Sequence, residues 1–206
     1  MKPKTWLGGA LLAMVAACGT VQPVPEPQYF RMPAAQLEQA DIAAISDAAI
    51  WVDTLSASSL YSERPVVYAL KPDAVRLRQY HYQYWVDPAP TQLRRRLTDH
   101  IRAARLSDVV SERPPQVDNR IRVSGFVTRF ERVRHDSGWV AVVELELKAE
   151  DTATGAVLLR QQVTESQPTE GDRMEATVSA FTAASDRSLE RFVSGLRDAL
   201  LKARTD

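Results

Sequence analysis

The sequence has little of what metal sites, disulfides and phosphate-binding loops require. It contains one cysteine, three histidines and eight glycines in 206 residues. A single cysteine excludes an internal disulfide, so an exported domain would have to be stabilised by its core alone. The histidines, His81, His100 and His135, are far apart and show no metal-ligand spacing such as H-E-x-x-H. We therefore expect no metal and no cofactor.

An excess of charge of one sign and a long apolar run are also missing. Lysine plus arginine and aspartate plus glutamate each total 26, so the formal net charge is zero. Nucleic-acid-binding domains usually carry a strong basic excess, and we therefore expect no nucleic-acid partner. The apolar run from Trp6 to Ala17 is shorter than the roughly 20 residues that a membrane-spanning helix needs.

That short apolar run instead has the features of a secretory signal. Lys2 and Lys4 precede it, and it ends in Val15-Ala16-Ala17-Cys18, which resembles the lipobox of bacterial lipoproteins. We predict that residues 1–17 are a signal peptide and that the thiol of Cys18 receives the lipid. The alternative is an ordinary secreted protein with a stray cysteine. By resemblance to Gram-negative lipoproteins, Gly19 favours attachment to the periplasmic face of the outer membrane.

The chain after the signal divides into a tether and one domain. Residues 18–34 contain the lipidated cysteine and a proline-rich stretch, which is expected to stay extended because it cannot bury enough surface to fold. Residues 35–206 have the length of one ordinary domain with its own core.

Hydrophobic periodicity predicts the elements of that domain. An alternation of two predicts strands, and an apolar stripe with helical spacing predicts helices that begin after Asp87 and Asp172. The last three predicted strands are close together and should form an antiparallel meander. We therefore expect a single α+β domain, a largely antiparallel sheet with two main helices packed on it. The predicted strands are residues 66–70, 75–85, 121–130, 139–147 and 157–163.

Two groups of side chains are candidate binding surfaces. The first is an aromatic strand with basic neighbours, in which alternation should place these residues on one face: Arg76, Arg78, Tyr80, Tyr82 and Tyr84. Packing of the same tyrosines in the core is the alternative. The second is the arginine-rich helix over residues 94–105, which could face phospholipid headgroups or an acidic partner. A solvated helix face, with His100 at the surface, is the alternative there.

No arrangement of residues indicates catalysis. Serines are plentiful, but no G-x-S-x-G nucleophile elbow occurs. Glu144 and Glu146 alternate onto the outer face of a predicted strand, which favours a solvated face over an acid–base pair. We therefore expect a protein that is not an enzyme.

An ordered set of segments is similar to the ABC-type transport auxiliary lipoproteins, the family that includes the paraquat-inducible lipoprotein. The set covers nearly the whole chain after the lipobox. Its members are V-V-Y-A-L at 66–70, R-Q-Y-H-Y-Q-Y-W-V-D-P-A-P at 78–90, I-R-V-S-G-F-V-T-R-F-E-R-V at 121–133, V-A-V-V-E-L-E-L at 140–147 and S-A-F-T-A-A at 179–184.

This resemblance implies a role and not a reaction. Such lipoproteins work beside an ABC transporter and a membrane protein of the mammalian-cell-entry type, in an apparatus for moving lipids between membranes. The implied partners are therefore these two proteins, together with the membrane through the lipid on Cys18. A structural envelope lipoprotein without a direct transport role is the alternative, and the sequence leaves open whether the chain forms a homo-oligomer.

Overall fold

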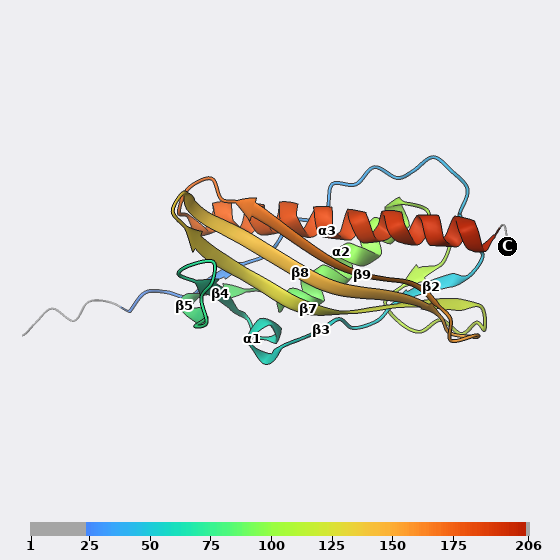
Figure 1. The fold of residues 1–206 in the computed structure, drawn as a ribbon, viewed down its shortest axis with the longest axis horizontal. Coiled ribbons are helices and arrows are strands. Elements are labelled where there is room, and N and C mark those ends of the chain that lie inside the picture. Colours follow the sequence, from blue (N-terminus) through green and yellow to red (C-terminus); the bar gives the residue numbers. More distant parts are fainter. Residues whose placement is uncertain (1–23, 205–206) are drawn as a thin grey trace, which may run out of the picture.

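Regular alternation of apolar and polar residues builds the three longest strands. In the computed structural model, which describes residues 24–204, β7 (Arg120–His135), β8 (Gly138–Asp151) and β9 (Val157–Pro168) form an antiparallel meander, as the sequence predicts (Figure 1). The apolar residues on one face of β8 are fully buried because the helices cover that face: Ala141, Val143, Leu145, Leu147 and Ala149.

Shorter strands extend this sheet to nine. They are β1 (Gln28–Phe30), β2 (Ala49–Val52), β3 (Ser56–Ala57), β4 (Pro65–Ala69), β5 (Arg78–Trp85) and β6 (Val110–Ser111). β2, β3 and β4 pair in parallel with β7, β6 pairs in parallel with β2, and β4 and β5 are antiparallel. The predicted α+β fold is confirmed, with the short strands adding parallel pairs to the antiparallel meander.

Two long helices lie side by side on one face of the sheet. They are α2 (Ala89–Ala103) and α3 (Met174–Ala203), and a four-residue helix, α1 (Ser59–Ser62), lies between β3 and β4. The predicted stripe of α2 is buried, and beneath the helices the rings of Phe130 and Phe181 stack with centroids 4.3 Å apart. In the described chain, no helix combines the length and the apolar character that crossing a membrane requires.

Both helices begin slightly later than their predicted caps. Pro88 and Arg173 stand at the N-cap positions instead of Asp87 and Asp172. The two aspartates have other partners, since Asp87 pairs with Arg95 at 2.6 Å and Asp172 with Arg134 at 3.2 Å. These ion pairs take the carboxylates away from the helix N-termini.

The ordered domain begins before the predicted boundary at residue 35. Gln28–Phe30 pair in parallel with residues 83–85 of β5, and Met32 is buried in the core. The Met32 amide donates to the Oε1 atom of Gln92 at 2.9 Å, and the Pro33 carbonyl accepts from Arg96 at 2.7 Å. Residues 28–33 are therefore part of the domain, because Met32 packs in the core and the backbone of this segment bonds to Gln92 and Arg96 of α2.

Candidate partner-binding surface

The predicted aromatic strand lies at the end of the molecule from which the N-terminal chain departs. Because β1 runs parallel to β5, the chain before Gln28 leaves toward the end where β5 begins (Figure 1). The 70–77 loop precedes β5 there. The β7–β8 hairpin lies at the same end, because Ala69 of β4 pairs with Val133 of β7. We call this end, formed by the 70–77 loop and the hairpin at residues 134–138, the proximal end.

Tyr80 belongs to a packed aromatic cluster. Its ring lies 4.4 Å from that of Tyr68, and its hydroxyl accepts a hydrogen bond from Arg132 at 3.0 Å. The buried Arg132 guanidinium stacks over Trp139 at 4.1 Å and also donates to the Asp172 carbonyl. Burial raises the pKa of Tyr80 and lowers the pKa of Arg132. Tyr80 is therefore half-buried and packed against Tyr68 and Arg132, which agrees in part with the alternative that the tyrosines belong to the core.

Tyr84 lies in a different group. Its ring is 5.7 Å from that of Tyr29 on β1, and its hydroxyl donates to the His81 carbonyl at 2.6 Å. The guanidinium of Arg64 lies over the exposed Tyr29 ring at 5.2 Å. This second cluster remains open to solvent at Tyr29, so it offers aromatic area that a partner could cover.

The expectation of one shared face for all five residues is wrong. Pro65 of β4 pairs with Tyr84 but Val67 pairs with Gln79, so β5 takes more residues than β4 across the same stretch. This irregularity breaks the alternation that the sequence suggests and separates the contacts of Tyr80 from those of Tyr84. Arg76 lies outside the strand, in the loop before it.

The half-buried Tyr82 and the exposed arginines Arg76 and Arg78 are the freest of the predicted residues. Tyr82 has its nearest aromatic contact with His81, at 6.4 Å. Across the part of the chain that the structure describes, the side chains of Arg76 and Arg78 make no hydrogen bond or ion pair. These three side chains are therefore available to an external partner.

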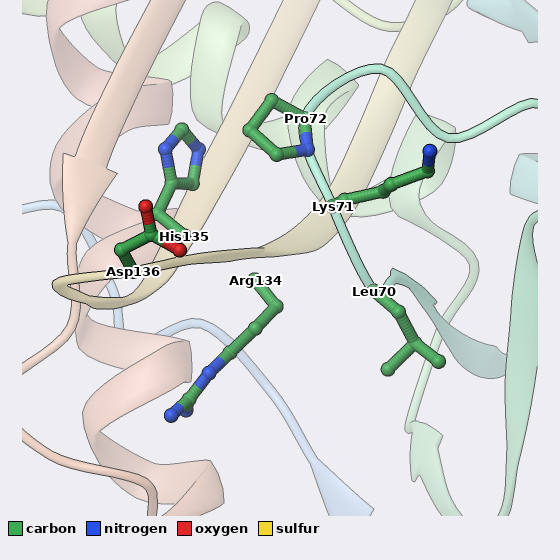
Figure 2. A pocket seen from close by; sticks show the side chains of 6 residues that line it. All are labelled: Leu70, Lys71, Pro72, Arg134, His135 and Asp136. Atoms are coloured by element: carbon green, nitrogen blue, oxygen red, sulfur yellow. The ribbon is translucent and has the colours of Figure 1, made fainter.

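A hollow of about 370 Å³ separates the 70–77 loop from the β7–β8 hairpin (Figure 2). Pro72 faces the hairpin residues His135 and Asp136 across it, while the Arg134 and Lys71 side chains extend away from the centre. The sequence predicts a strand from residue 75, whereas β5 begins at Arg78, and it does not indicate that the loop and the hairpin meet. Their meeting depends on the parallel pairing of β4 with β7, for which the sequence carries no local signal.

The arginine-rich helix is a solvated face only in part, because Arg95 and Arg102 are more than half exposed while Arg96 and His100 are buried. Arg96 and His100 are 5% and 4% exposed, and both bind Asp186 of α3. The Arg96 Nη2 atom lies 2.7 Å from one Asp186 oxygen, and the His100 Nε2 atom lies 2.9 Å from the other. Partial burial opposes ionisation of Asp186, but the hydrogen bonds from His100 and Arg96 outweigh it and hold the pKa at about 2.

A second buried polar group lies on the other face of the sheet. The Tyr61 hydroxyl of α1 donates to Glu131 at 2.5 Å, and Arg129 pairs with the same carboxylate. Burial and the neighbouring Glu131 raise the pKa of Tyr61. Each of these two polar groups joins elements that are distant in the sequence, and its charged side chains bond to one another. In residues 24–204, no group of three or more potential metal ligands occurs.

The family is shown by a comparison of the sequence with family profiles. Residues 30–192 match the profile described as the ABC-type transport auxiliary lipoprotein component. The chain belongs to this family. The family is that of a transport component and not a known enzyme family, and it supports a membrane-anchored protein of the bacterial envelope. Among curated proteins, none matches the sequence significantly.

Solved structures share the fold of this auxiliary lipoprotein. A Xanthomonas campestris protein of family DUF330 is 16% identical with a TM-score of 0.75, covering 87% of this chain and 99% of its own. An uncharacterised protein is 16% identical with a TM-score of 0.65, covering 82% and 98%. A hypothetical protein of Chlamydia trachomatis is 6% identical with a TM-score of 0.52, covering 75% and 98%. At such identities the likeness concerns the fold alone.

Proposed function

We propose that this lipoprotein is an outer-membrane-anchored accessory component of an envelope lipid-transport system, and that it acts by docking to a protein partner without turnover. The partner would be a membrane protein of the mammalian-cell-entry type that works with an ABC transporter. Membership of the transport auxiliary family carries the proposal. The lipobox ending at Cys18, which lies outside the described residues, supports the anchor.

The proposed docking residues are those of the tyrosine strand and its basic neighbours, with Arg78 and Tyr82 at the centre: Arg76, Arg78, Tyr80, Tyr82 and Tyr84. Interface energy usually concentrates in a few aromatic and arginine side chains. Tyr82 and Arg78 supply both types with few internal contacts, while Tyr80 and Tyr84 are held by their own clusters and would form a rigid surround. A surface fixed in this way loses little conformational entropy when a partner binds.

Photo-crosslinking in intact envelopes tests this role. A photoreactive residue would replace Tyr82 in the mature lipidated chain, and a matched chain would carry it at Phe126, an exposed aromatic on the β7 strand away from the proximal end. We expect crosslinks from position 82, and not from position 126, to a mammalian-cell-entry-type protein identified by mass spectrometry. Crosslinks only to envelope proteins unrelated to transport would favour a structural scaffold instead.

The anchor has its own test. Mass spectrometry of the mature protein should find lipid on an N-terminal Cys18, and Cys18→Ser should accumulate an uncleaved precursor without lipid. One acyl chain binds a membrane only marginally, whereas several anchor a protein stably. An unmodified mature N-terminus at another residue would contradict the proposed attachment.

A further inference from the structure

The 70–77 loop exposes apolar and basic side chains together. Val75 is fully exposed and Leu70 is 50% exposed, although most large apolar side chains of the domain are buried. Lys71 and Arg76 lie in the same loop with exposed side chains, and Lys71 pairs at the surface with Asp73 at 3.6 Å. Single exposed apolar residues are ordinary on a protein surface, so it is their combination with cations at one turn that indicates a binding surface.

The position of this loop identifies the kind of partner. The N-terminal chain leaves the domain at the proximal end, beside this loop (Figure 1). Since β1 begins at Gln28, only residues 19–27 separate the domain from Cys18, a span of at most about 30 Å at roughly 3 Å per residue. The 30-residue helix α3 is roughly 45 Å long and leads away from this end. A lipid on Cys18 would therefore keep the proximal end within about 30 Å of the membrane, with α3 leading away from it.

The charge at this loop suits an anionic lipid surface. Four cations, Lys71, Arg76, Arg78 and Arg134, lie at the loop and the adjoining hairpin and strand, against three carboxylates, Asp73, Asp136 and Asp172. Lys71 pairs with Asp73 and Arg134 with Asp172, so Arg76 and Arg78 supply the unpaired positive charge. The connection between β9 and α3 reaches the hairpin, where Asp172 pairs with Arg134. Half-buried Trp139 of the hairpin lies 5.4 Å from the Arg134 guanidinium, and tryptophan is enriched where proteins meet lipid headgroups.

We propose that the 70–77 loop rests on an anionic phospholipid surface, with Leu70 and Val75 entering the headgroup region and Lys71 and Arg76 contacting lipid phosphates. The inference rests on the lipid anchor of the proposed function. It also orients the domain, because contact through this loop directs α3 away from the membrane. Of the five residues of the proposed docking surface, Arg76 would then contact lipid phosphates, while Arg78 and Tyr82 on β5 remain available to the protein partner.

Fluorescence of a label at position 75 tests the contact in the anchored protein. Acylation consumes the only native thiol, so Val75→Cys in the mature lipidated chain provides a single labelling site. The chain would be reconstituted in vesicles of phosphatidylcholine with or without phosphatidylglycerol, and quenching by lipid-borne quenchers would be measured. Val157→Cys, an exposed valine at the opposite end, is the matched control.

We expect strong quenching at position 75 in phosphatidylglycerol vesicles and little quenching at position 157. The pair Lys71→Glu and Arg76→Glu should lower the membrane-bound population at position 75 at least tenfold, because each cation near such a surface contributes roughly fivefold. The pair Arg160→Glu and Arg197→Glu changes the net charge equally at exposed sites elsewhere and should leave it unchanged. Unfolding temperatures would show that the two cysteine variants and the two charge-reversed pairs are folded.

The outcomes separate this inference from the anchor on which it rests. If the chain floats with the vesicles but positions 75 and 157 are equally exposed to water, the loop contact is overturned and the anchor stands. If equal quenching occurs with and without phosphatidylglycerol, the anionic partner is overturned. If position 75 is protected only when a partner protein is added, the loop is a protein interface. If the chain does not float at all, both proposals fail.

Discussion

Helix α2 and the 70–77 loop both concentrate basic residues, and the molecule uses them in opposite ways. In α2, Arg96 is buried against Asp186 and the Pro33 carbonyl, and Arg94 donates to the Val52 and Glu112 carbonyls. In the loop, Arg76 bonds to nothing in the described chain. The arginine content of a segment therefore does not predict a binding surface. The carboxylates and carbonyls that the fold brings to each guanidinium decide whether its charge is internal or available.

Removing the carboxylate at the centre of the buried group should have the largest effect. Asp186→Asn leaves Arg96 buried without a counter-charge, and breaking a buried pair in this way costs about 3–5 kcal/mol. Urea unfolding would measure the loss. Asp172→Asn is the control, because its pair with Arg134 is exposed and should contribute at most about 1 kcal/mol. Similar small losses for both variants would contradict the distinction between the two regions.

Shortening the chain to begin at Ala35 should lower the free energy of unfolding by about 2–4 kcal/mol relative to a chain beginning at Val24. The shorter chain lacks β1, the buried Met32 and the Pro33 carbonyl that accepts from Arg96. Loss of a buried methionine alone costs about 2–5 kcal/mol when its site cannot collapse. Equal free energies of unfolding for the two chains, measured by chemical unfolding, would show that residues 28–33 do not stabilise the domain.

Acid should weaken the same buried group. Because the folded pKa of Asp186 is about 2, below its ordinary value of 3.8, its contribution is fully present above about pH 4. It is lost as the pH falls from about 4 through 2, by roughly 2 kcal/mol. Unfolding free energies across this range should fall more steeply for the wild type than for Asp186→Asn. Parallel pH profiles for the two proteins would refute this assignment.

Truncating the exposed arginine should have the smallest effect on stability. Arg76→Ala removes no internal contact and should change the unfolding free energy by less than about 0.5 kcal/mol. Arg96→Ala, the matched truncation in α2, leaves Asp186 without its bidentate partner and should cost several times more. A loss above about 1 kcal/mol for Arg76→Ala would assign that residue a structural role.

The long elements of the fold could be predicted because their patterns are local. β7, β8 and β9 alternate over many residues, and the stripe of Leu93, Leu97 and Ile101 predicts the buried face of α2. The short parallel strands could not be predicted in this way. β2 and β3 become strands only by pairing with β7, far along the chain, and β1 carries three residues inside a proline-rich stretch.

The sequence indicates which side chains could form the candidate surface, but it does not predict how the fold arranges them. Tyr80, Tyr82 and Tyr84 all lie on β5, but the irregular pairing of β4 with β5 places Tyr80 and Tyr84 in different clusters. Likewise His100 and Arg96 look like surface residues because their partner, Asp186, is on another helix. A sequence pattern reports which side chains share a local face, and it does not report a distant counter-charge.

The affinity of the purified domain for the proposed mammalian-cell-entry-type partner, measured with Tyr82→Ala, tests the docking role most directly. Phe126→Ala removes a comparably exposed ring elsewhere and serves as the control. The account predicts that Tyr82→Ala weakens binding by about 1 kcal/mol or more, at least fivefold, with an unchanged unfolding temperature. Unchanged affinity in a fully folded Tyr82→Ala protein would contradict docking through the tyrosine strand.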